Sequence, residues 1–147
     1  MASPPTATVT VRRRFSASAE QVFDAWLDPA MIGQWMFGPK LRDEEIVSLK
    51  VDAQVGGRFS FVVRREGKEL DHVGKYLEID RPRRLVFTWG IAGFSVDETD
   101  VTVEIVPLDD GCELTLTHRN VWSDYAERTQ AGWTTMVETL ARELGST

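Results

Sequence analysis

The sequence is poor in the residues on which many metalloproteins, thiol enzymes and secreted proteins depend. Its 147 residues contain one cysteine, Cys112, and two histidines, His72 and His118. A single cysteine cannot form an internal disulfide, and it fits a reducing compartment. The histidines do not stand in a metal-ligand spacing such as H-E-x-x-H, and no paired C-x-x-C occurs. We therefore expect no metal site, no bound cofactor and no recognisable catalytic group.

Long apolar runs and an excess of positive charge are also missing. No apolar run approaches the roughly 20 residues that span a bilayer, and the first residues lack the apolar segment of a secretory signal. We therefore expect a cytoplasmic protein that does not insert into membranes. The net charge of −6 argues against nucleic acid as a partner. The triplet Arg12-Arg13-Arg14 does not change this, because side chains in an extended strand alternate between faces.

What is present fits one globular domain over residues 1–147, with 42% hydrophobic residues available for a core. Residues 6–15 alternate between apolar and polar side chains, which predicts a half-buried strand. Ser18 and Gln21 match a capping box at the start of a short helix that carries Phe23 and Trp26. Residues 29–37 predict a second short helix that begins with Pro29.

The middle of the chain consists of short alternating segments separated by Gly, Pro and Asp, which indicates an antiparallel sheet with one wet face. In the segment 69–80 the inner face is ambiguous, because Val73, Leu77 and Ile79 compete with His72, Gly74 and Tyr76 for the inner side. We place the strands near residues 43–51, 57–66, 69–80, 83–91, 96–107 and 110–120.

A long helix closes the predicted order of elements. Ser123 or Asp124 can cap it, and apolar side chains recur from Ala126 to Leu144 at helical spacing. About 20 residues at 1.5 Å each span roughly 30 Å, enough to cross a sheet. The chain therefore reads as an α+β fold: one strand, two short helices, six strands and a long C-terminal helix.

Five segments carry a family resemblance: RRRFSASAEQVFDAWLDPAMIGQW, VGGRFSF, VGKYLEIDRPRRLVFTW, CELTLTH and AGWTTMVETLARELG. Together with the order of the elements, these segments resemble the SRPBCC or START-related superfamily. Within it, the chain is similar to proteins like the C-terminal domain of the activator of heat-shock-protein-90 ATPase. The resemblance implies a helix-grip fold, in which a curved antiparallel sheet of about seven strands wraps the C-terminal helix and leaves a cavity between them. Family members often carry two adjacent tryptophans where this chain has Trp35-Met36.

The cavity that the resemblance implies would be lined by large apolar side chains. Trp133 either lines this cavity or is plain core packing under the helix, since a tryptophan combines a large apolar body with an N–H that needs a partner. The expected ligand-binding residues are the wall residues Trp35, Phe59, Phe61, Phe87, Trp89, Trp133, Met136 and Leu140, joined by the polar residues Arg13, Tyr76 and His118.

Two of these polar residues stand on otherwise apolar faces. Arg13 shares its strand face with Val11 and Phe15, and His118 shares its face with Leu116. Each is either a satisfied structural residue, in an ion pair or a hydrogen bond, or one of the few polar groups of an apolar pocket. The inward faces of the assigned strands contain no carboxylate for Arg13. The second reading therefore predicts a preference for acidic amphipathic ligands, with charged His118 as a second donor.

Three functions follow from these observations. The first is binding of a hydrophobic or amphipathic small molecule between sheet and helix. The second is a co-chaperone module that acts on a heat-shock-protein-90-type ATPase, although the chain has no counterpart of the separate N-terminal domain of the eukaryotic activators. The third is an enzyme of the polyketide-cyclase or hydrolase type, which needs a titratable pair such as His118 with Tyr76 or His72. The sequence leaves self-association as a homodimer open.

Overall fold

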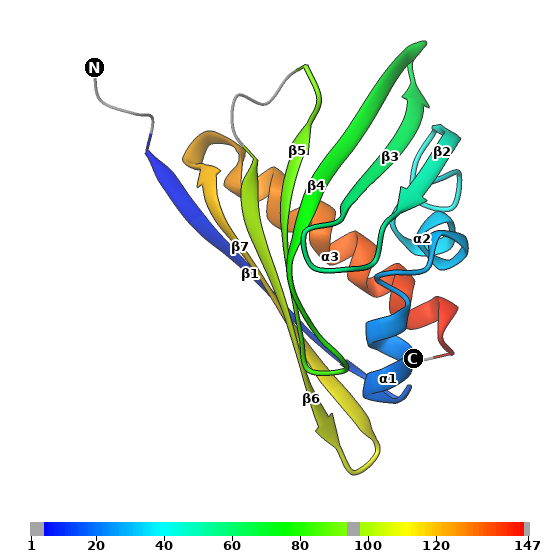
Figure 1. The fold of residues 1–147 in the computed structure, drawn as a ribbon, viewed down its shortest axis with the longest axis vertical. Coiled ribbons are helices and arrows are strands. Elements are labelled where there is room, and N and C mark those ends of the chain that lie inside the picture. The colour runs from blue at the N-terminus through cyan, green and yellow to red at the C-terminus, as the bar shows by residue number, and fades with distance from the viewer. Residues whose placement is uncertain (1–4, 94–97, 146–147) are drawn as a thin grey trace.

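The computed structural model describes residues 5–93 and 98–145 and shows a curved antiparallel sheet with a long helix across one face (Figure 1). The helix-grip fold is therefore confirmed. The strands lie in the order β1-β7-β6-β5-β4-β3-β2, so that β1 and β2 form the two edges. The strands are β1 (Thr6–Phe15), β2 (Glu45–Val51), β3 (Arg58–Arg65), β4 (Lys68–Asp80), β5 (Arg84–Ile91), β6 (Thr99–Leu108) and β7 (Gly111–Trp122); the helices are α1 (Ala19–Asp24), α2 (Pro29–Trp35) and α3 (Ala126–Glu143).

The signals for the starts of the two short helices are confirmed, but both helices end earlier than expected: α1 ends at Asp24, before Trp26, and α2 ends at Trp35. Ser18 caps α1 in a complete capping box with Gln21, and Pro29 stands in the first turn of α2 after its N-cap Asp28. The predicted cap of the last helix is wrong. Ser123 and Asp124 lie in a short 3-10 turn, and α3 begins after Tyr125 without a side-chain cap.

The predicted strands agree with the observed ones within a few residues. The first residues of the expected strand 96–107 are an exception, because residues 96 and 97 lie outside the described part of the chain. The ambiguous strand resolves clearly: His72, Gly74 and Tyr76 face inward, whereas Leu77 is 44% exposed. A register irregularity between Tyr76 and Glu78 explains why simple alternation does not continue to Ile79.

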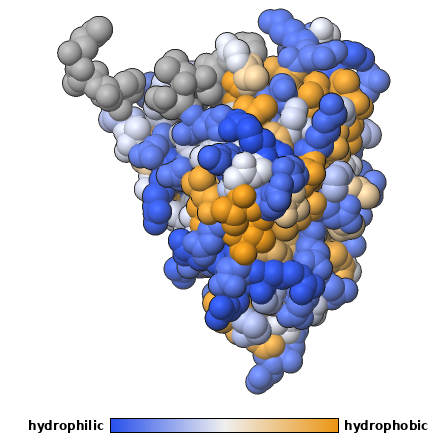
Figure 2. All heavy atoms as spheres, in the orientation of Figure 1, coloured by the Kyte–Doolittle hydropathy of each residue, from blue (hydrophilic) through white to orange (hydrophobic). Residues whose placement is uncertain are grey.

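Burial of the side chains alternates along β3 and β7, so one face of the sheet is buried and the other is partly exposed, as expected for a sheet with one wet face. Figure 2 shows a mostly hydrophilic surface with apolar residues gathered near its centre and toward the upper right. On the opposite face, α3 packs against β1 and β7 at one side and against α2 at the other. The concave side of β3, β4 and β5 is thereby left to the segment that contains α1 and α2.

Candidate functional site

Aromatic rings gather on the inner face of the three central strands. Phe59 stacks on Phe61 with ring centroids 4.7 Å apart, and it also contacts Tyr76 at 5.6 Å and Phe87 at 5.8 Å. Strand alternation puts these side chains on one face, and register places them side by side. Trp89 continues the row on β5. The structure thus brings together the five aromatic residues of the sheet that the sequence predicts as ligand contacts.

The opposite wall comes from the segment that holds α1 and α2. Trp26, just after α1, and Met36, just after α2, close over the strand residues. The volume open to the centre of a water molecule is about 10 Å³, room for roughly one water. We call this space the aromatic cavity; its walls are Trp26, Met36, Phe59, Phe61, Tyr76, Phe87 and Trp89.

Trp35 does not line the aromatic cavity, contrary to expectation. It is fully buried, its indole Nε1 donates to the Ala25 carbonyl at 3.0 Å, and its ring meets the edge of Trp26 at 4.6 Å. Trp35 therefore supports Trp26 from behind. The neighbouring Met36 reaches the space instead.

Trp26 carries an unpartnered polar atom. Its side chain is buried, and its indole Nε1 has no hydrogen-bond partner among the described residues. Burying an amide-like N–H without an acceptor costs roughly 1–3 kcal/mol in proteins. A wall residue of the aromatic cavity thus presents a donor that the chain itself leaves unsatisfied.

Trp133 belongs to a buried hydrogen-bond chain that joins α3 to the sheet. Its indole Nε1 donates to His118 Nδ1 at 3.1 Å, and His118 Nε2 lies 2.6 Å from the Thr99 hydroxyl. That hydroxyl donates to the Trp89 carbonyl at 3.1 Å, so it accepts from His118. Because an indole N–H can only donate, His118 is neutral with its proton on Nε2.

Neutral His118 differs from the charged ligand donor that the sequence suggested. Burial lowers the pKa of His118 to about 4, and the charge of Asp100 opposes this only in part. Both ring nitrogens are already engaged within the chain. The structure therefore favours the first reading, a hydrogen-bonded core histidine.

Arg13 also finds an internal partner. Its Nε donates to Glu138 Oε1 of α3 at 2.9 Å, and its Nη1 donates to the Arg14 carbonyl at 2.6 Å. Strand alternation alone does not indicate Glu138, because this acid comes from the helix α3. The expected preference for acids through Arg13 thus loses its basis.

The helix residues predicted as walls lie beside the aromatic cavity and do not line it. Trp133 contacts the rings of Trp26 at 6.1 Å and Trp89 at 5.2 Å, and it packs behind them. Leu140 is fully buried in the core, and Met136 is half-buried at its margin. The helix α3 therefore lies behind the walls, which come from β3, β4, β5 and the segment that holds α1 and α2.

The inner face of β4 contributes two titratable side chains. His72 Nδ1 lies 3.1 Å from the Phe61 carbonyl and therefore carries the proton, and burial lowers the pKa of this ring. Burial raises the pKa of Tyr76, so its hydroxyl stays neutral. Both residues present neutral groups at the ordinary pH of a cell.

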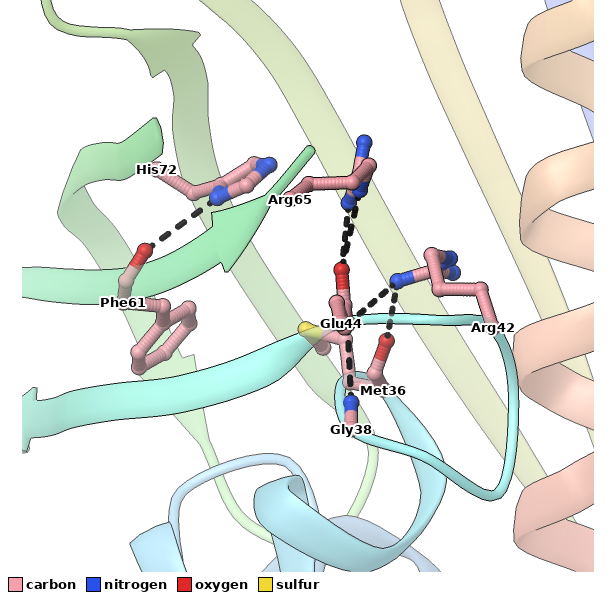
Figure 3. A network of polar contacts seen from close by, with 7 residues as sticks. All are labelled: Met36, Gly38, Arg42, Glu44, Phe61, Arg65 and His72. Carbon is pink, nitrogen blue, oxygen red and sulfur yellow. Dashed lines mark hydrogen bonds and ion pairs between the residues drawn. The ribbon is translucent and has the colours of Figure 1, made fainter. Parts of the chain in front are cut away.

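A buried carboxylate next to this face was not foreseen from the sequence. Glu44 precedes β2, and its side chain is 0% exposed. It accepts hydrogen bonds from the Gly38 N–H, from Arg42 and from Arg65 (Figure 3). Alternation along β3 places Arg65 in the inward row of Phe59, Phe61 and Val63, a signal that could have identified it. No such signal exists for Glu44, which lies outside any repeating element.

The described residues hold no group of three or more His, Cys, Asp and Glu side chains suited to a metal ion. Among the same residues, no helix is long and apolar enough to cross a membrane.

The comparisons with known proteins agree with this architecture. A protein from Rhizobium loti is 26% identical, with 97% of this chain and 99% of that chain covered and a TM-score of 0.81. A protein from Chromobacterium violaceum is 24% identical, with 95% and 98% covered and a TM-score of 0.82. No curated protein matches the sequence. The model of the family "Activator of Hsp90 ATPase homolog 1-like protein" matches residues 16–145. Since this match spans most of the chain, the chain belongs to that family.

Proposed function

We propose that the chain binds a small, mainly apolar molecule that carries a hydrogen-bond acceptor, and that the aromatic cavity receives it. The observation that carries this proposal is the unpartnered indole N–H of Trp26 in an aromatic wall. Ligand sites are mostly apolar, with a few polar groups that fix the orientation of the ligand. An acceptor such as a carbonyl oxygen would satisfy the Trp26 donor.

The size of the aromatic cavity limits how a ligand enters. With room for roughly one water, the space admits a larger molecule only when wall side chains move. Met36 is the wall residue best suited to this, because its unbranched side chain adapts to irregular shapes at low cost. We expect binding to be accompanied by movement of Met36, and therefore by a change in the fluorescence of the neighbouring Trp26.

Acetophenone and ethylbenzene are two probes of similar apolar size, but only acetophenone carries a hydrogen-bond acceptor. We expect the protein to bind acetophenone roughly fivefold more tightly, the gain typical of one net hydrogen bond. Trp26→Phe keeps an aromatic ring and removes the N–H, so it should abolish this preference. Titration calorimetry on both proteins, with Trp122→Phe as the control, measures the ratio; Trp122 is 51% exposed and lies outside the walls.

A second measurement on the unmodified protein does not depend on folding of the variant. The indole N–H resonance of Trp26 should shift on addition of acetophenone and much less with ethylbenzene. If neither probe binds, or if both bind equally to the unmodified protein, Trp26 is only a packing residue and the proposal fails.

A further inference from the structure

Two arginines approach the inner face of the sheet around a single buried carboxylate. Arg42 Nη1 donates to Glu44 Oε2 at 2.9 Å, and Arg65 donates to Glu44 Oε1 through Nε at 3.1 Å and through Nη2 at 2.6 Å. The Gly38 N–H adds a bond of 2.8 Å to Oε2. Each oxygen of Glu44 thus accepts two hydrogen bonds and is saturated. Figure 3 shows the two guanidinium groups reaching Glu44 from different sides.

The charges and donors of this cluster do not balance. Two guanidinium groups face one carboxylate, which leaves one positive charge in a chain whose net charge is −6. A guanidinium has five N–H donors. Besides Glu44, Arg42 meets the Met36 carbonyl at 3.4 Å, and the described residues offer the remaining N–H groups of the two arginines no other acceptor. The two side chains are 25% and 35% exposed, so an external anion can reach them.

Arg42 lies one ring away from the aromatic cavity. The guanidinium of Arg42 lies 5.9 Å from the centroid of Phe37. The ring of Phe37 in turn lies 5.8 Å from Phe61 and is stacked on Trp89 at 6.5 Å, and both of these line the cavity. Arg65 extends the inward row of β3 beyond Phe61. A molecule with its apolar part in the cavity could therefore extend a short chain past Phe37 to the arginines.

We propose that Arg42 and Arg65 bind the carboxylate of an amphipathic acid whose apolar part occupies the aromatic cavity. The inference rests on the proposed function and specifies its ligand class. A single excess charge matches a monoanion, and the planar fork of a guanidinium matches the two oxygens of a carboxylate. Glu44 holds both forks in place before the ligand arrives, which reduces the ordering cost of binding.

The test compares 3-phenylpropanoate with 3-phenylpropan-1-ol, which share the ring and the chain. Calorimetry near neutral pH should show the acid binding roughly tenfold more tightly or better, the gain of a charge-assisted hydrogen bond. Arg65→Gln keeps an amide donor for Glu44 and removes the charge, so the ratio should fall to about twofold or less. Arg64→Gln is the matched control. It removes the same charge from the adjacent residue, which pairs with Glu45 and Glu69 on the outer side of β3.

The outcomes distinguish failure of the carboxylate site from failure of the proposed binding function. If the alcohol binds and the acid binds no better, the carboxylate site is wrong while the binding function stands. If neither binds, both fail. An unchanged acid preference in Arg65→Gln, or acetate alone competing as strongly as 3-phenylpropanoate, would also overturn the inference. Should Arg65→Gln not fold, Arg42→Gln and the Arg65 Nε–H resonance of the unmodified protein provide the readout: that resonance must shift with the acid and not with the alcohol.

Discussion

Gly74→Ala is expected to destabilise the protein by about 3 kcal/mol or more, a large effect for one methyl group. A Cβ at this position would overlap the backbone carbonyl oxygen of Thr88 and lie 2.5 Å from the ring of Phe59. Neither neighbour can withdraw easily, because one belongs to the adjacent strand and the other is packed among the cavity rings. Urea denaturation should show a much lower midpoint, or no cooperative transition at all.

Gly132→Ala is the matched control and should have the opposite sign. Gly132 lies inside α3, and a Cβ there would meet no atom within 4 Å apart from its chain neighbours and the nearby backbone of its own helix. Alanine is favoured over glycine in a helix by about 0.5–1 kcal/mol, so the midpoint should rise. A mild effect of Gly74→Ala, similar in size to that of Gly132→Ala, would mean that β4 and β5 are not as close as the structure places them.

Acid is expected to weaken the fold through His118. The folded pKa of about 4 lies below the ordinary value of 6.5, so the unfolded chain takes up a proton that the folded chain refuses. The stability that neutral His118 supports is therefore complete above about pH 6.5 and is lost as the pH falls toward 4. At 1.36 kcal/mol per pKa unit, the loss attributable to this ring is about 3 kcal/mol. Protonation would also place a hydrogen on His118 Nδ1, where it would face the indole N–H of Trp133 and break that hydrogen bond.

The comparison that isolates this contribution uses His118→Gln. The glutamine amide retains an acceptor for Trp133 and a donor for Thr99, but it does not titrate. His72 shifts stability in the same direction, because its pKa is also lowered by burial, and it remains in both proteins. Denaturation at pH 7 and pH 4 should show a loss about 3 kcal/mol smaller in the variant. Equal losses would show that folded His118 accepts a proton readily, and the hydrogen-bond chain would then be wrong.

The fold could be predicted from the sequence to the extent that short-range patterns determine it. The capping box at Ser18 depends on residues close in the chain. The same is true of the shared inner face of Phe59 and Phe61. Short-range patterns did not determine the inner face of strand 69–80. Its irregularity near Leu77 depends on how β4 pairs with β5, a strand formed by later residues.

The candidate site depended on information that periodicity does not carry. The rotation of α3 about its axis decides that Glu138 meets Arg13, and strand parity alone cannot supply it. The wall residues Trp26 and Met36 lie just beyond the ends of short helices, where helical spacing no longer indicates direction. Glu44 lies in a connection between elements, and only the folded chain shows that it is buried.

The position of β1 at the edge next to β7 affects the order in which the chain folds. Phe15 pairs with Cys112 and Thr6 with Trp122, contacts that join the first strand to the last across almost the whole chain. Such distant contacts close a large loop, which raises the entropic cost of forming them early and slows folding. During synthesis, the apolar side of β1, with Val9, Val11 and Phe15, has no partner strand until β7 has emerged. β1 must therefore wait for β7, and its apolar side stays unprotected while the residues between the two strands are synthesised.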